Sequence, residues 1–205
     1  MVKIRPVAPD DTDQLYAISL ATGAAGGDAV HLYRDGRMMG HIYSVPYAKL
    51  SPETCLVAED DGGVAGYIVG TLDTRAFEAR LQREWWPGLR ALYRLPSGDP
   101  EGWDADQRRA FMIHYPTLAP TLVVDAFPAH LHMNLLPRIQ GRGLGTALLD
   151  HWLSDARAAG MRGVHVSVNA GNEAGLRFWK ARGFVCLLPP IAPPHPRTIW
   201  LGYTM

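Results

Sequence analysis

The stretch at residues 131–146 combines residue types that bind an anion through the protein backbone. An apolar run at 131–136 predicts a buried strand, glycines alternate with other residues over 141–145, and apolar residues then recur at helical spacing. Glycine lets the backbone approach a ligand, and the first turn of a helix leaves unpaired N–H groups with the helix dipole behind them. We therefore predict a phosphate-binding site here, with further side-chain donors from Gln140 and Arg142.

Two common phosphate-binding motifs do not fit this stretch. A P-loop requires Lys directly before its Ser or Thr, whereas Gly145 stands directly before Thr146. The dinucleotide fingerprint requires a further glycine at a fixed spacing, where this chain has Thr146 or Leu148. The spacing argues against both nucleotide sites.

What the stretch does resemble is the pyrophosphate loop of the GNAT (GCN5-related N-acetyltransferase) superfamily, which reads Gln-x-x-Gly-x-Gly after a strand ending in Leu-Leu-Pro. A second stretch, 172–184, resembles the next motif of that superfamily, with Asn, a short helix, an aromatic pair and Gly-Phe. The sequences at 129–137 and 162–165 are similar to a narrower group, the bacterial acetyltransferases that resemble the histone-acetyltransferase-like domain of O-GlcNAcase.

This resemblance implies one α/β (α+β) domain over residues 1–205, with a central mixed sheet, flanking helices and a splayed strand that binds acetyl-CoA. It implies direct transfer of acetyl from acetyl-CoA to an amine of a small molecule, peptide or protein, with no metal. A backbone N–H near Leu135 would polarise the thioester carbonyl. The residues expected to contact the coenzyme are Leu135, Leu136, Gln140, Gly141, Arg142, Gly143, Leu144, Gly145, Thr146, Asn169, Asn172, Phe178 and Trp179.

Two positions depart from the pattern of the superfamily. GNAT enzymes commonly have a tyrosine at the position of Trp179 to protonate the departing thiolate, and an indole N–H is no acid near neutral pH. We expect Trp179 to pack along the pantetheine arm and His132 or Asn134 to stabilise the thiolate, although similar proteins tend to carry Asp in place of Asn134. The alternative is an acetyl-CoA-binding protein with little or no transferase activity, such as an acyl-CoA sensor.

Polar side chains alternate with apolar ones along two predicted strands, at 130–136 and 164–169. Alternate residues of a strand share a face, and a helix between two strands implies that they are parallel neighbours. Their polar faces could then form one seam, which is either a hydrogen-bonded layer that satisfies itself or a proton route beside the coenzyme. The residues of this seam are His130, His132, Asn134, His165, Ser167 and Asn169.

The rest of the chain supplies the remaining elements of such a domain. Alternation predicts a first strand at 2–7, and turn residues at 61–63 predict a hairpin of strands at 54–60 and 64–71. Two closing strands are expected at 184–188 and 199–205. A glycine-rich stretch at 22–28 reads as a flexible connection more than as a phosphate cradle, since no strand precedes it.

Residues 73–128 form an insertion relative to a minimal GNAT domain. Apolar residues at helical spacing over 77–92 predict an amphipathic helix that is interrupted near Pro87. Trp85 and Trp86 read as core residues, with the lining of an acceptor pocket as the alternative. Because the insertion directly precedes the catalytic strand, we expect it to wall the acceptor side of the cleft.

Composition limits the classes of partner and the location. Acidic and basic residues number 20 each, so the formal net charge is zero and gives no reason to expect a nucleic acid or a membrane as partner. Cys55 and Cys186 are predicted to be reduced core thiols of a cytoplasmic protein, and no apolar run is long enough to span a membrane. The proline-rich segment at 189–196 reads as a rigid surface connection, and a homodimer is left open.

Overall fold

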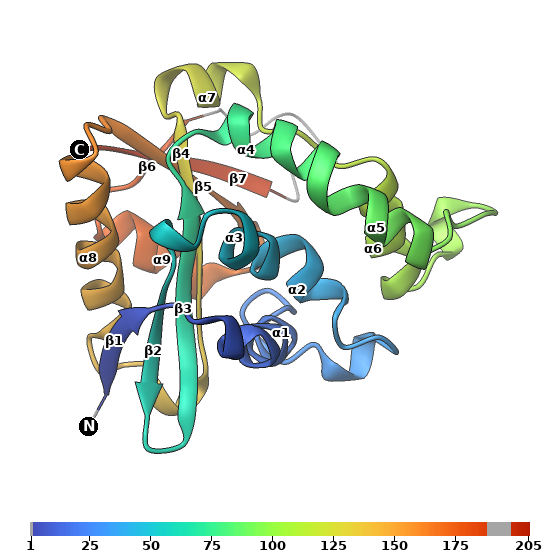
Figure 1. The fold of residues 1–205 in the computed structure, drawn as a ribbon, viewed down its shortest axis with the longest axis horizontal. Helices are drawn as coiled ribbons and strands as arrows, with labels where there is room; N and C mark the ends of the chain where they lie inside the picture. The colour runs from blue at the N-terminus through green and yellow to red at the C-terminus, as the bar shows by residue number, and fades with distance from the viewer. Residues whose placement is uncertain (1, 188–197) are drawn as a thin grey trace.

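The computed structural model describes residues 2–187 and 198–205, and a seven-stranded sheet forms its centre (Figure 1). Neighbouring strands are antiparallel except for β4 and β5, which are parallel. The predicted mixed sheet with flanking helices is therefore confirmed. In spatial order the strands are β1 (Lys3–Pro6), β2 (Leu56–Asp60), β3 (Gly63–Thr71), β4 (Ala129–Leu135), β5 (Gly163–Asn169), β7 (Thr198–Thr204) and β6 (Val185–Cys186).

The two parallel strands separate soon after they meet. β4 and β5 pair only at Ala129 with Val164 and at His130 with His165, whereas β4 stays paired with β3 as far as Leu135. The carboxyl ends of β4 and β5 therefore diverge, which opens the sheet at its middle. This opening has the geometry expected of a splayed strand.

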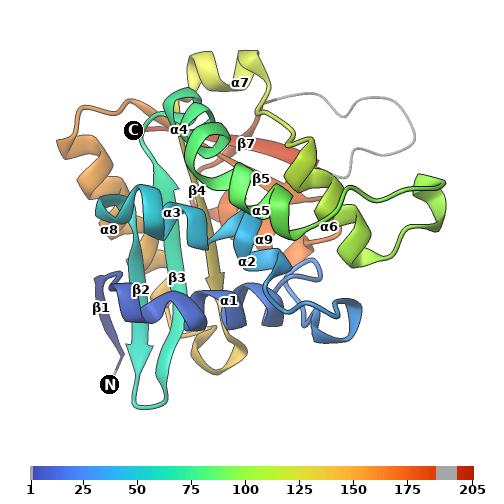
Figure 2. The same ribbon diagram turned by 45° about the vertical axis from the view of Figure 1, so that its right-hand side comes forward.

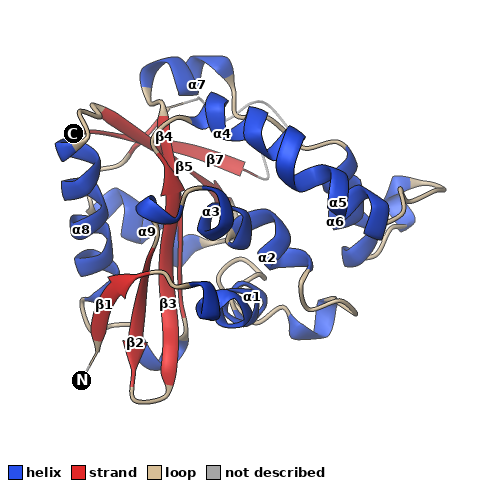
Figure 3. Cartoon of the chain, in the orientation of Figure 1, coloured by secondary structure: helices blue, strands red, loops and turns tan. Residues whose placement is uncertain are grey.

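Helices cover both faces of the sheet (Figure 3). On one face α8 (Leu144–Ala158) and α9 (Glu173–Ala181) enclose a core that includes Ile68 of β3. On the other face α1 (Thr12–Ala21), α2 (Met38–Tyr43) and α3 (Val45–Leu50) enclose a second core that includes Tyr67 and Val69. Successive residues of β3 thus enter opposite cores, as the alternation of side chains along a strand requires.

Residues 73–128 form a helical layer beside α2 and the second core (Figure 2). The predicted interruption occurs as a π-helical segment, Leu81–Trp85, between α4 (Thr74–Arg80) and α5 (Trp86–Leu92). Pro87 explains it, since proline has no N–H to continue an α-helical ladder. The layer continues through α6 (Ala105–His114) and α7 (Thr121–Ala126).

Short 3-10 turns connect several of these elements. They cover Pro9–Asp11, Val30–Leu32, Pro52–Thr54, Pro100–Gly102 and Pro137–Ile139. In the described ranges, no helix combines the length and the apolar character that a membrane crossing requires.

The prediction for Cys186 was wrong, both tryptophans of the insertion pack with the second core, and one predicted segment lies outside the described residues. Cys55 is buried as predicted, but Cys186 is exposed on the two-residue strand β6 and is not a core thiol. Trp85 is partly buried and donates a hydrogen bond from Nε1 to the carbonyl oxygen of His41 at 2.9 Å, while Trp86 is buried in the second core. The proline-rich segment at 189–196 lies outside the described residues.

Candidate active site

The loop between β4 and α8 presents a run of unused backbone donors. Gly141 and Gly143 have φ values of +70° and +78°, the left-handed region that favours glycine, and Gly143 is the N-cap of α8. The N–H groups of residues 141–146 donate to no acceptor within the described chain. Successive N–H groups in such a turn, at the positive end of a 15-residue helix, form an anion-binding concavity.

The side chains around this loop divide between bracing it and facing solvent. Gln140 donates from Nε2 to the carbonyl oxygen of Leu135 at 2.7 Å, so it braces the loop, and its second amide N–H donates to no described residue. Arg138 pairs with Asp60 at 3.0 Å. Arg142 is exposed and makes no ion pair with a described residue, so its guanidinium remains available to an anion.

Packing explains several other residues of the predicted coenzyme site. A Cβ on Gly145 would lie 3.3 Å from the Phe178 ring, so α8 approaches α9 closely here and a side chain at this position would crowd that ring. Leu144 and Leu135 pack against the first core, and Leu136 contacts both cores. The N–H of Leu136 donates to the carbonyl oxygen of Ala65 at 2.7 Å, which holds the end of the strand on β3.

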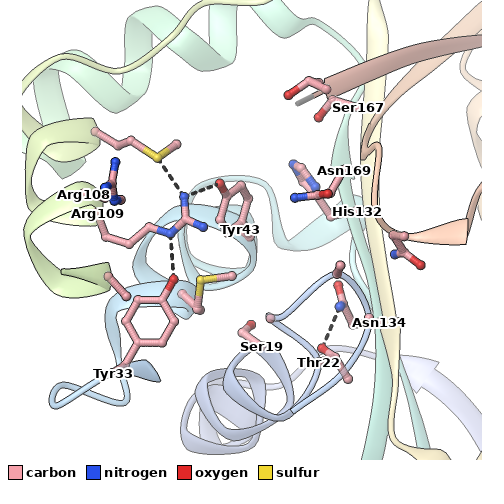
Figure 4. A pocket seen from close by; sticks show the side chains of 18 of the residues that line it. Ser19, Thr22, Tyr33, Tyr43, Arg108, Arg109, His132, Asn134, Ser167 and Asn169 are labelled. Carbon is pink, nitrogen blue, oxygen red and sulfur yellow. Dashed lines mark hydrogen bonds between the residues drawn. The ribbon is translucent and has the colours of Figure 1, made fainter. Parts of the chain in front are cut away.

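A cavity of about 730 Å³ lies beside the opening between β4 and β5 (Figure 4). Its walls come from the end of α1 and the turn that follows, from α2, from α6 and from both strands. Asn169 and Asn172 of the predicted coenzyme site line this cavity, and Asn172 also caps α9 by accepting from the Gly175 N–H at 2.9 Å. The cavity therefore lies at the carboxyl ends of the two splayed strands, and residues 141–146 are not part of its lining.

Asn134 lines the cavity in a fixed orientation. Its Oδ1 accepts a hydrogen bond from the Tyr67 hydroxyl at 3.0 Å, and its Nδ2 donates to Thr22 Oγ1 at 2.6 Å. Burial raises the pKa of Tyr67 to about 12, so this hydroxyl keeps its proton. One N–H of the Asn134 amide has no partner among the described residues and is available as a neutral donor.

A chain of hydrogen bonds sets the tautomer of His132. Thr74 Oγ1 donates to the carbonyl oxygen of Pro128 at 2.6 Å, so it must accept from Nδ1 of His130 at 2.8 Å. Nε2 of His130 then accepts from the Tyr47 hydroxyl at 2.7 Å, and the Tyr47 oxygen accepts from Nε2 of His132 at 3.1 Å. His132 is thereby left with its lone pair on Nδ1, which accepts no hydrogen bond from a described residue.

Both histidines are neutral in this arrangement. Burial lowers the pKa of His132 to about 4, with a smaller effect from His165, and burial lowers the pKa of His130 well below its ordinary value. Because His132 lines the cavity, its Nδ1 can accept a proton from a bound group. The chain ends at a backbone carbonyl, which has no proton to pass on, so it orients His132 and is not a continuous proton route.

The two polar faces of β4 and β5 meet only in part. The rings of His130 and His165 lie 5.4 Å apart between centroids, and His165 donates from Nδ1 to the carbonyl oxygen of Phe127 at 2.7 Å. Beyond this pair the strands diverge, so His132 and Ser167 face the space between them. The predicted polar seam therefore forms where β4 and β5 are still paired, at His130 and His165.

Trp179 does not occupy the place that was predicted for it. The side chain is only 7% exposed and belongs to the first core, with its ring centroid 5.0 Å from that of Phe184 and 5.1 Å from that of Phe178. It lines neither cavity. The assignment of Trp179 to the pantetheine arm and to catalysis is therefore corrected to a packing role.

Several residues that line the cavity were not predicted from the sequence. Tyr33, Tyr43 and Tyr67 come from segments without a motif, and Arg109 lies in α6, a part of the insertion in which no element was predicted. A second cavity of about 270 Å³ lies next to α4 and includes Trp86 in its wall. The only signal that could have indicated Arg109 was its position in the insertion expected to wall the acceptor side.

We expect the stability of the protein to fall as the pH is lowered below about 6.5. Burial lowers the pKa of His130, His132 and His165, so below that pH the unfolded chain binds protons that the folded chain does not. The free energy of unfolding should decrease towards about pH 4 by up to about 1.4 kcal/mol per pH unit for each histidine.

Urea unfolding at about pH 7 and about pH 5 measures this loss of stability. A shallower pH dependence is expected in His130→Gln, whereas the same change at the exposed His151 should leave the dependence unaltered. An unchanged pH dependence in His130→Gln would contradict the assignment.

Similarities to known proteins agree with this geometry. The chain belongs to the GNAT acetyltransferase family, because the sequence model of the acetyltransferase (GNAT) family matches residues 40–184. The structure of SsHAT is 32% identical and superposes with a TM-score of 0.88, over 99% of this chain and 98% of that one.

More distant similarities extend this result. Protein O-GlcNAcase of Rattus norvegicus is 25% identical over 185 residues, which cover 88% of this chain but 20% of that protein, so the chain spans about a fifth of this relative. The structure of yncA from Salmonella typhimurium, determined with its cofactor acetyl-CoA, shares the fold at a TM-score of 0.55 and 16% identity, over 100% of this chain and 94% of that one. The resemblance to GNAT proteins of the O-GlcNAcase group is confirmed.

Proposed function

We propose that the protein transfers an acetyl group directly from acetyl-CoA to an amine. The observation that carries this proposal is the row of N–H groups at 141–146 that donate to no described residue, in the loop that follows β4 where it has separated from β5. A cavity lined by His132 lies beside the same opening. The N–H groups suit a pyrophosphate, and the opening suits an extended arm. Membership of the GNAT family and the acetyl-CoA bound to yncA give further support.

In the proposed reaction the loop binds the coenzyme, and two side chains of β4 act on the reacting groups. Residues 141–146 and Arg142 hold the pyrophosphate, and bound acetyl-CoA supplies a thioester as the acetyl donor. The free amide N–H of Asn134 donates towards the acetyl oxygen as negative charge develops on it. Nδ1 of His132 accepts the proton that the attacking amine loses as the C–N bond forms. The C–S bond then breaks, and the coenzyme A thiolate that leaves takes this proton from His132, which returns to its neutral form.

The second candidate is an acetyl-CoA-binding protein with little or no transferase activity. It is favoured by the lack of an ionisable group at two positions, since Asn134 is an amide and Trp179 is buried in the core. In this case the thiolate has no protein acid at the position of Trp179. Coenzyme binding is then retained while transfer is slow.

A calorimetric titration with acetyl-CoA, followed by an assay of thiol release with a panel of amines, tests both candidates. We expect micromolar binding, about −8 kcal/mol, and thiol release that depends on the amine. Binding without amine-dependent release would favour the second candidate. The absence of binding would contradict both.

A further inference from the structure

The wall of the cavity opposite β4 carries a cation without a carboxylate partner. Arg109 of α6 points into the cavity from one side, while His132 and Asn134 face it from the other (Figure 4). No described Asp or Glu lies within ion-pair distance of Arg109. A guanidinium keeps its charge at any physiological pH, so this wall is positive.

Two of the three guanidinium nitrogens of Arg109 donate hydrogen bonds to described residues, and the third does not. Nε donates to the Tyr33 hydroxyl at 3.0 Å, and Nη1 donates to the Tyr43 hydroxyl at 3.1 Å and contacts Met112 Sδ at 2.9 Å. Nη2 donates to no described residue. No buried side-chain nitrogen or oxygen lacks a partner in the described ranges, so Nη2 is accessible, on the cavity side of the guanidinium (Figure 4).

Two hydroxyls extend this donor set. Tyr33 and Tyr43 accept from Arg109 through their oxygens, and neither hydroxyl proton is used in a hydrogen bond to another described residue. Burial raises the pKa of Tyr43, so that group stays protonated. Arg109 and the two hydroxyls together offer charged and neutral donors to one anionic group.

The rest of the cavity lining contains nothing to neutralise this charge. Among its described residues there is no Asp or Glu, and Arg108 adds a second cation. The sequence of residues 188–197 contains no Asp or Glu either. A second positive charge on the acceptor would therefore be unfavourable in this cavity, whereas a negative charge would be stabilised.

Tyr43 also relates this anion site to the proposed proton acceptor. The guanidinium carbon of Arg109 lies 5.4 Å from the Tyr43 ring centroid, and the His132 ring centroid lies 5.7 Å from the same point. Arg109 and His132 thus lie against the same ring, within reach of the two ends of a small molecule. One end would face Arg109 while the amine faced His132.

We propose that Arg109, with Tyr33 and Tyr43, binds an anionic group on the acceptor, which is therefore a small amine carrying a carboxylate or a phosphate at its other end. This inference rests on the proposed acetyl transfer. It names the class of substrate and assigns specificity to α6. The side chain of a protein lysine, which carries no such anion, is a poor acceptor in this scheme.

Matched amines measure the preference directly. δ-Aminovalerate, n-pentylamine and cadaverine share a chain length and end in a carboxylate, a methyl group and a second ammonium, and phosphoethanolamine with ethanolamine tests a phosphate. We expect wild-type kcat/KM for δ-aminovalerate or for phosphoethanolamine to exceed that of its uncharged counterpart at least about tenfold. Cadaverine should be used least.

Arg109→Met tests the residue itself. The value of KM for the anionic amine should rise about tenfold or more, while kcat/KM for n-pentylamine changes less than about twofold. Arg109→Lys, which keeps the charge, should retain part of the preference, and Tyr33→Phe removes one hydroxyl without changing charge. The matched control is Arg83→Met, because Arg83 is exposed and lines neither cavity.

Failure of this inference differs from failure of the proposed function. Equal use of anionic and neutral amines by the wild type, or an equal loss for both in Arg109→Met, would overturn the anion site and leave acetyl transfer intact. If no amine is acetylated, the proposed function fails. The anion site is then decided by calorimetric titration of N-acetyl-δ-aminovalerate into the complex with coenzyme A, where Arg109→Met must weaken binding about tenfold and an unchanged affinity overturns it.

Discussion

Replacing Gly143 with valine should weaken acetyl-CoA binding at least about 100-fold while the protein remains folded. Gly143 has a φ of +78°, and a Cβ there would meet no protein atom within 4 Å, so the new side chain would enter the space in front of the loop. A β-branched residue in this region costs on the order of 1–3 kcal/mol and turns the N–H groups of 141–146 away from a common point. Calorimetric titration with acetyl-CoA measures the loss.

The other end of the same helix supplies a matched control. Gly160 has a φ of +82° and equally open surroundings, and it follows the last turn of α8. Gly160→Val should lower the melting temperature by a similar amount and leave coenzyme affinity unchanged. Wild-type affinity in Gly143→Val would refute the binding site, and a loss of affinity in both variants would trace the effect to folding.

Replacing His132 with glutamine should lower kcat for amine acetylation about 100-fold while the affinity for acetyl-CoA changes little. The substitution removes the Nδ1 lone pair that the bond to Tyr47 leaves open to the cavity. A positioned base contributes roughly 100-fold to 10,000-fold to a proton transfer. Thiol release at saturating acetyl-CoA, compared with a calorimetric titration of the same variant, separates the two effects.

The pH profile of the wild type adds a second test of this role. Burial lowers the pKa of His132 to about 4, so the imidazole is neutral throughout the working range and should cause no break near about pH 6.5. The rate should rise with pH only as the free amine becomes deprotonated.

Two variants complete this test. Tyr47→Phe should reduce kcat about tenfold, since His132 loses the partner that fixes its tautomer. His151→Gln on the exposed face of α8 is the control. Unimpaired turnover in His132→Gln would remove His132 from the mechanism.

The parts of the site that are local in sequence were predictable. The left-handed conformation of the loop depends on Gly141 and Gly143 themselves, and its N–H groups are oriented by the helix that follows. The anion-binding loop could therefore be predicted from the motif alone. The separation of β4 from β5 was predicted only from the resemblance to the GNAT family and not from the residues of the two strands. Its physical cause is that β4 remains paired with β3 up to Leu135.

The rest required the tertiary structure. Trp179 was assigned to the coenzyme because it stands at the position of the family's tyrosine, and a motif does not show whether a larger side chain there turns into the core, where Trp179 packs on Phe184. Arg109 is held in place by hydrogen bonds to Tyr33 and Tyr43, which lie 76 and 66 positions earlier in the chain. No pattern in the sequence marks such a set as one site.

Two hydrogen bonds between Thr74 and Pro128 join the ends of residues 73–128. Both the N–H and the hydroxyl of Thr74 donate to the Pro128 carbonyl oxygen, at 2.9 and 2.6 Å, and so the two ends of the segment close on each other beside the first residues of β4. The same hydroxyl begins the chain of hydrogen bonds that orients His132. Because Phe77 in this segment also stacks on Tyr47, changes in the segment are expected to reach His132 as well as the wall of the cavity.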